Sequence, residues 1–93
     1  MITSRQRLAA VAGKCFEGKT AQAKDELRHA AYSQFVGREI ESSNGLTDTE
    51  VEQMLTLWEH WETPFMPSSE GRKQVNEYAR QYQEVHGQES LPM

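Results

Sequence analysis

Apolar residues recur along this chain at intervals of three and four, the spacing that places them on one face of an α-helix. The pattern predicts four helices, at about residues 4–17, 21–36, 47–62 and 69–86. No segment shows the two-residue alternation of a strand. We therefore expect an all-α fold. The predicted apolar stripes are Leu8, Val11, Ala12, Cys15 and Phe16; Ala23, Leu27, Ala30 and Ala31 with Phe35 or Val36; Val51, Met54, Leu55 and Trp58, with or without Trp61; and Val75, Tyr78, Ala79, Tyr82 and Val85.

The most informative segment is the junction between the second and third predicted helices. Gly37 is a helix stop, and a short polar loop follows it. Thr47 and Glu50 have the spacing of a capping box, and Leu46 and Val51 have the spacing of a hydrophobic staple. This combination predicts a capped junction, similar in outline to a helix-turn-helix, that fixes the angle between two helices.

The other helix ends carry similar signals. Thr3 with Gln6 predicts a second capping box. Thr20, and either Ser68 or Ser69, are the expected caps of the second and fourth helices. The expected stops are Gly18, Pro64 and Gly87.

The length of 93 residues suits one small domain, which we place at residues 1–87, with a disordered tail at 88–93. Three to four helices would share one core. We expect the Thr63–Pro67 linker to cover the core edge, and the fourth helix either to pack through its aromatic residues or to project outward. The predicted core residues are Leu8, Val11, Phe16, Leu27, Ala31, Val51, Leu55 and Trp58.

The net charge of −4 conceals an asymmetry: residues 1–38 carry +4 and residues 39–93 carry −8. The basic part suits phosphate or an acidic partner, and the acidic part suits a basic protein. The alternative is that the two parts attract each other within the fold.

No catalytic constellation stands out, so we expect no enzyme activity, no cofactor and no metal site. Cys15 lies on an apolar stripe, which favours a buried structural thiol in a reducing compartment. His29, His60 and His86 lie on three different predicted helices, without the spacing of zinc ligands.

Nucleic-acid binding is one of two binding modes to consider. The third predicted helix carries five acidic residues and no Lys or Arg, so phosphates would repel it. Direct contact would have to come from the basic first part of the chain. The candidates for such contact are Arg5, Arg7, Lys14 and Lys19.

Protein binding is the other mode. Aromatic and charged residues from Arg38 onward suit a protein interface, although aromatics near a helix end also close small cores. Trp61 and Phe65 are the residues we expect to be partly exposed if a binding site exists. A homodimer through Tyr78 and Tyr82 is a further alternative. The candidates for partner binding are Arg38, Glu50, Glu52, Glu59, Trp61 and Phe65.

One ordered series of residues has a parallel among known proteins. It comprises Ile2-Thr3 with Gln6, Asp25 with Arg28, Val36-Gly37-Arg38-Glu39-Ile40, Ser42-Ser43, Leu46-Thr47 and Glu50. Over residues 2–60 the series resembles small helical bacteriophage proteins, including the GemA-like regulatory proteins of Mu-type phages, and short modules of phage recombination proteins. The segment after Pro64 has no counterpart in this resemblance.

The resemblance implies a phage accessory protein that acts by binding, in DNA metabolism or early gene regulation. It implies no enzyme activity and assigns Gly37, Ser42, Ser43, Leu46 and Thr47 a structural role. The acidic third helix favours a host or phage protein as the partner over nucleic acid. The alternative is an inhibitor of a host protein. With no run of apolar residues long enough to span a membrane, we expect the cytoplasm of an infected bacterium.

Overall fold

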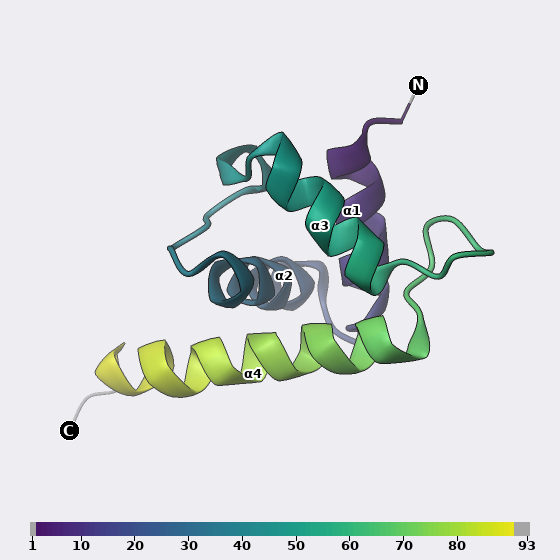
Figure 1. The fold of residues 1–93 in the computed structure, drawn as a ribbon. Coiled ribbons are helices and arrows are strands. Elements are labelled where there is room, and N and C mark those ends of the chain that lie inside the picture. Colours follow the sequence, from purple (N-terminus) through teal and green to yellow (C-terminus); the bar gives the residue numbers. More distant parts are fainter. Residues whose placement is uncertain (1, 91–93) are drawn as a thin grey trace.

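The computed structural model describes the backbone of residues 2–90 and the side chains of residues 2–85. Within that range the chain forms four α-helices: α1 (Ser4–Lys14), α2 (Ala21–Val36), α3 (Asp48–Trp58) and α4 (Ser69–Ser90) (Figure 1). A 3₁₀ turn, η1 (Ser43–Gly45), precedes α3. The only extended pairing in these residues is a single bridge between Glu59 and Pro67. The prediction of a small all-α domain is confirmed.

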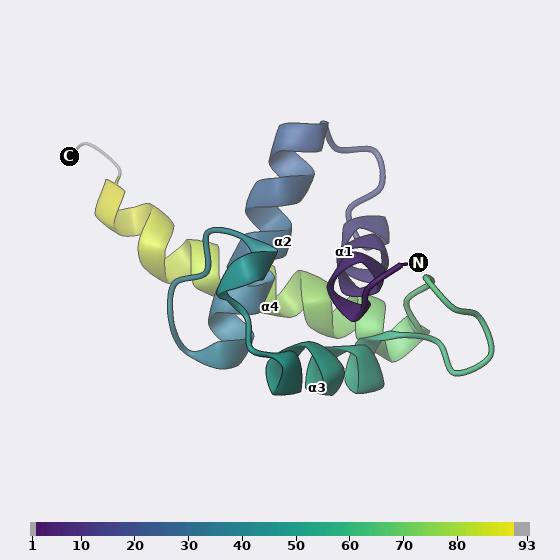
Figure 2. The same cartoon turned by 90° about the horizontal axis from the view of Figure 1, so that it is seen from above.

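The helices α1, α2 and α3 all lie on one side of α4, which runs beneath them in Figure 1. The most extensive contact joins α2 to α4, followed by that of α1 with α3. Figure 2, seen from above, shows the end of α4 extending past α2 and the loop after α3 extending away from the helices on the other side. The chain is therefore elongated, with principal extents of 47 × 27 × 21 Å.

The core contains nearly all of the residues that the helical pattern predicts. Leu8, Val11, Ala31, Val51 and Trp58 are at most 1% exposed. Among the other predicted core residues, Phe16 and Leu55 are buried, and Leu27 packs against the cluster while keeping partial exposure.

Two core residues escaped the helical pattern. Tyr32 is fully buried, although it lies beside the apolar stripe expected for α2. Ile40 is 4% exposed, although it lies in the polar loop. The hydroxyl of Ser33 fixes this loop, because it accepts a hydrogen bond from the Ile40 N–H at 2.8 Å and donates one to the His29 carbonyl at 2.8 Å.

The capped junction is confirmed. Gly37 adopts φ 79°, a left-handed conformation that ends α2. The Thr47 hydroxyl accepts a hydrogen bond from the Glu50 N–H, and the Glu50 carboxylate accepts one from the Thr47 N–H. The guanidinium of Arg38 bridges the junction, donating to the Gly45 carbonyl and to both oxygens of Glu50. The other predicted capping box, at Thr3, and the Thr20 cap are also present.

The start of α4 lies unusually close to the end of α3. Ser68 caps α4, because its hydroxyl accepts a hydrogen bond from the Gly71 N–H at 2.9 Å. A Cβ atom on Gly71 would lie 2.2 Å from the Trp58 carbonyl oxygen, so only glycine permits this approach. Further along α4, Arg72 and Asn76 donate hydrogen bonds to the carbonyls of Lys14 and Cys15 at the end of α1.

Three predicted helix ends are wrong. Helix α1 ends at Lys14 instead of residue 17, and turns lead on to Gly18, which has φ 89°. Helix α3 ends at Trp58 instead of residue 62, because the following backbone turns back and pairs with the segment before α4. Helix α4 continues through Gly87 to Ser90. Of the expected tail, residues 91–93 lie outside the described residues.

Candidate functional site

The loop that joins α3 to α4 is the most distinctive part of the surface. Its two sides are held together by hydrogen bonds from the His60 N–H to the Met66 carbonyl at 2.7 Å and from the Ser68 N–H to the Trp58 carbonyl at 2.8 Å. Both Figure 1 and Figure 2 show it extending beyond the helices. Trp61 lies in this loop and is 87% exposed.

The residues on either side of Trp61 are held by hydrogen bonds within the loop. The ring of Trp61 is stacked on that of His60, with 6.3 Å between centroids and 11° between planes. Nδ1 of His60 accepts a hydrogen bond from the Glu62 N–H at 3.1 Å, and the Glu59 carboxylate accepts one from the Phe65 N–H at 3.0 Å. Phe65 has φ 69°, which is rare for a bulky residue. Hydrogen bonds therefore order this loop, and the loop presents a large aromatic ring to solvent.

Three depressions lie around the exposed side of α3, and Glu52 lines all three of them. One lies toward α2 and includes Phe35 and Leu57. Another lies toward the loop and includes Trp61 and Pro64. The third lies toward the start of α1. Thr56 separates the first two, because it lines both.

We call the surface formed by Glu52, Thr56, Leu57 and Trp61 the α3 face. It is mainly apolar toward α2, acidic at Glu52, and mixed toward the loop, where Trp61 and Pro64 lie among charged residues. Leu57 is 46% exposed, whereas Val51, Met54, Leu55 and Trp58 on the other side of α3 are buried. Leu57 is not among the functional candidates that the sequence predicts. Its place outside the apolar stripe of α3 could have indicated that it is exposed.

The residues predicted to bind a partner divide into two groups. Glu52, Glu59 and Trp61 meet around the depression next to the loop. Arg38 and Glu50 instead form an ion pair with each other, at 2.5 Å, at the far end of α3. That pair lowers the pKa of Glu50 to about 2, chiefly because the guanidinium hydrogen-bonds to the carboxylate. Phe65 is half-buried, which agrees with the partial exposure expected of it.

Two of the four residues predicted to contact nucleic acid are engaged within the fold. Arg5 pairs with Asp48 at 2.7 Å and also donates a hydrogen bond to the Leu46 carbonyl. The Nε atom of Arg7 lies 3.1 Å from the Glu59 carboxylate. Lys14 is half-buried and Lys19 is exposed. The basic and acidic parts of the chain therefore do attract each other within the fold.

The surface suggested for a homodimer is also partly used within the chain. The ring of Tyr78 meets the ring of Phe35 edge-on, with centroids 5.8 Å apart. Tyr78 and Tyr82 both pack against the core as half-buried side chains. Neither tyrosine stands free on the surface of α4.

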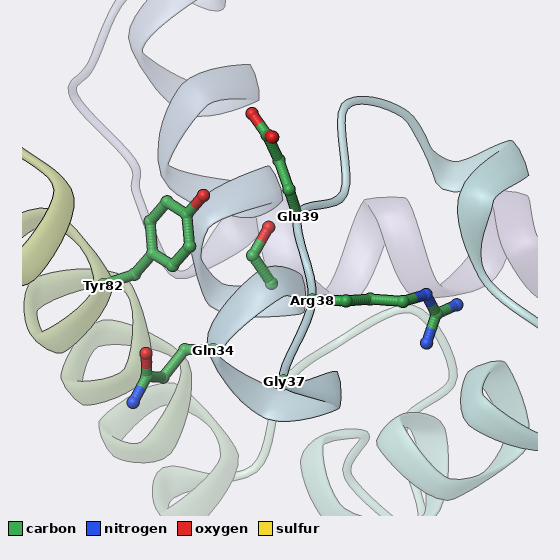
Figure 3. A pocket seen from close by; sticks show the side chains of 6 residues that line it. Gln34, Gly37, Arg38, Glu39 and Tyr82 are labelled. Atoms are coloured by element: carbon green, nitrogen blue, oxygen red, sulfur yellow. The ribbon is translucent and has the colours of Figure 1, made fainter.

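A separate hollow of about 360 Å³ lies where α2 ends against α4. Figure 3 shows Gln34, Glu39 and Tyr82 around it, with the side chain of Arg38 directed away from Tyr82 and Gln34. Since that guanidinium is already bound to Glu50 and to Gly45, it is not available to a ligand in the hollow. This hollow is therefore a weaker candidate for a binding site than the α3 face.

The residues described by the structure bring no three His, Cys, Asp or Glu side chains together as a metal site would require. Cys15 is buried, and burial raises its thiol pKa to about 11, which suits the predicted structural role. Among residues 2–90, no helix combines the length and the apolar character needed to cross a bilayer.

Comparison with protein families, with curated proteins and with solved structures finds no match to this chain.

Proposed function

We propose that this chain is a small, non-enzymatic protein that acts by binding another protein through the α3 face. The observation that carries this proposal is the exposure of Trp61, 87%, on a loop that its own hydrogen bonds hold in place. Exposed tryptophans are frequent anchors of protein interfaces, since they bury a large area with few rotatable bonds. An ordered loop loses little conformational entropy on binding, which favours affinity.

The proposed setting is a bacteriophage accessory protein in the cytoplasm of an infected bacterium. The resemblance of residues 2–60 to phage regulatory proteins supports a role in phage DNA metabolism or early gene regulation. The acidic character of the α3 face supports the alternative, an inhibitor that docks on a host protein. Both settings use the same binding face, and the identity of the partner decides between them.

Direct nucleic-acid binding is the less favoured function. Arg5, Arg7 and Arg38 would have to leave their ion pairs with Asp48, Glu59 and Glu50 before they contacted phosphate. Lys14 and Lys19 have no such internal ion pair in the described part of the chain. Lys24 and Lys73 also lack an ion pair among the described side chains, and four single lysines provide only a small electrostatic footprint for a duplex.

Affinity capture from a bacterial lysate tests the proposal. The tagged protein, the Trp61→Ala variant and the Val85→Ala variant are compared with and without nuclease treatment, and bound proteins are identified by mass spectrometry. Val85 is a matched control, because it is a large apolar residue that is 59% exposed on α4, away from the α3 face. We expect a stoichiometric, nuclease-resistant partner that the Val85 variant keeps and the Trp61 variant loses.

Two results would contradict the proposal. Equal recovery by the Trp61 variant would remove the α3 face from the interaction. The second is that only DNA-associated proteins are captured, that nuclease treatment abolishes their capture, and that the capture depends on Lys14 and Lys19. That result would favour nucleic-acid binding as the function.

A further inference from the structure

We infer that the α3 face receives a positively charged amphipathic helix of the partner protein, with a lysine or arginine of that helix seated on Glu52. This inference rests on the proposed function, because it names the chemistry of the element that the proposed binding site accepts. It depends on three features of the surface: the position of Glu52, the apolar groups on either side of it, and the balance of charge.

Glu52 occupies the centre of the face. It is exposed, and it lines each of the three depressions around α3. Within the described side chains, no Lys, Arg or His forms an ion pair with it, whereas Asp48, Glu50 and Glu59 on either side are all paired. The acid that a partner can reach from every side is thus the one that the fold leaves without a cation.

Apolar groups lie on both sides of this acid. Phe35 and Leu57 line the depression toward α2, and Trp61 and Pro64 line the depression toward the loop. A partner that covers Glu52 therefore meets a mainly apolar depression toward α2, and apolar groups set among charged ones toward the loop. An element with apolar side chains along one face and a basic residue between them matches this arrangement.

The charge of the surroundings favours a basic partner. The depression next to the loop is lined by two carboxylates, Glu52 and Glu59, and by one guanidinium, that of Arg7. Glu62 follows Trp61 in the loop, is exposed, and has no ion-pair partner among residues 2–85. An acidic partner would meet uncompensated repulsion here, and a basic one would meet complementary charge.

The shape of the face favours a helix over an extended segment. An extended peptide usually binds by adding a strand to a sheet edge, and residues 2–90 contain no strand to extend, only the single bridge between Glu59 and Pro67. Thr49, Glu52 and Thr56 instead form an exposed ridge at helical spacing on α3, with depressions along it. A second helix packs against such a ridge by placing its own side chains in the depressions.

Selection from a library of displayed random peptides, about 16 residues or roughly four helical turns long, tests the inference. The full chain is the bait. We expect the enriched peptides to carry net positive charge and apolar residues at helical spacing. Affinities of the enriched peptides, measured by fluorescence polarisation, should fall about tenfold or more for Glu52→Lys and for Trp61→Ala.

Glu41→Lys is the matched control. Glu41 is exposed in the loop before η1, has no ion-pair partner among the described side chains, and lines none of the three depressions. The substitution changes the net charge of the protein by the same amount as Glu52→Lys. If the Glu41→Lys variant binds the peptides within about twofold of the affinity of the unmodified protein, the position of the charge matters and the net charge does not.

Three outcomes would overturn the inference: enriched peptides that are neutral or acidic, an equal loss of affinity for the Glu41 and Glu52 variants, or no enrichment at all. None of them affects the proposed function, which stands if the captured protein still depends on Trp61. If Trp61 is dispensable for capture from the lysate, the proposed function fails whatever the peptide selection shows.

Discussion

At Gly71 the backbone of α4 lies close against the end of α3. The carbonyl oxygen of Trp58 occupies the space that a side chain would need, at 2.2 Å from the Cβ position. We expect Gly71→Ala to lower the free energy of unfolding by roughly 2 kcal/mol or more, because neither backbone can move without disturbing the Ser68 cap. Urea denaturation followed by circular dichroism measures the change.

Gly13 provides the control for this substitution. It lies within α1, and nothing is within 4 Å of its Cβ position. Gly13→Ala should leave stability unchanged or raise it by up to about 1 kcal/mol, since alanine favours a helix over glycine. Equal effects of the two substitutions would show that the close approach at Gly71 is not a constraint on the fold.

Ser33 is the only buried polar residue of the described core, and it holds Ile40 in place. Ser33→Ala would leave the buried N–H of Ile40 without its acceptor. We expect a loss of about 1–3 kcal/mol in the free energy of unfolding and faster hydrogen exchange at the Ile40 amide. Unchanged exchange at that amide would show that Ser33 does not hold the loop.

These residues show why the sequence predicts part of the core and not all of it. Leu8, Val11 and Trp58 follow the helical period, and so their burial could be predicted. Ile40 lies in a loop, where no period applies, and its burial depends on a hydroxyl seven residues earlier. The requirement for glycine at position 71 depends on Trp58, on another helix, and no local pattern records it.

At the scale of the element, the first turn of α3 combines a capping box with the Arg38 ion pair. The pKa of Glu50 is lowered from 4.5 to about 2, so its charged form stabilises the folded state. A lowered carboxyl pKa contributes stability above the unfolded-state value, and this contribution is lost as the pH falls from about 4.5 toward 2.

The variant Glu50→Gln tests this linkage. Glutamine retains an oxygen that can accept the Thr47 N–H, but it removes the charge. We expect the variant to be less stable than the unmodified protein at pH 7, and the difference to shrink as the pH falls below about 4.5. Urea midpoints measured from pH 7 to pH 2 check this, and a difference that stays constant with pH would contradict the ion pair as its source.

The starts of the helices could be predicted better than their ends. A start depends on a local hydrogen bond, such as that of Thr47 or Ser68, which the sequence displays. The end of α3 depends on tertiary structure, because the backbone after Trp58 leaves the helix to pair with residues that precede α4. Pro64 pointed to a later end, since nothing in the local sequence records that pairing.

At the scale of the whole molecule, opposite charges connect distant segments. Arg5 and Arg7 from α1 pair with Asp48 and Glu59, at the two ends of α3. The charge asymmetry of the sequence left two readings open, an interface for partners or attraction within the fold. The structure supports the second for these arginines. Exposed pairs of this kind contribute little stability individually, so their main consequence is to neutralise the basic surface.

The candidate site could be predicted only in part. The sequence identified Trp61, Glu52 and Glu59, because aromatic and acidic residues gather toward the end of the third predicted helix. It grouped Arg38 and Glu50 with them, and the structure separates these two as a pair at the junction. That Asp48 and Glu59 are paired while Glu52 is not depends on the position of α1, which a one-dimensional pattern does not contain.

The hydrogen bonds from α4 to the end of α1 have a consequence for the folding of the chain during its synthesis. Arg72 and Asn76 reach carbonyls that lie 58 and 61 residues earlier. A ribosome that adds roughly 5–20 residues per second needs roughly 3–12 s to make that separation. Until α4 has been made, the face of α2 that packs against it, in the most extensive helix contact of the fold, is uncovered and open to chaperones. Of the four helices described, α4 is thus the last to pack onto the others during synthesis.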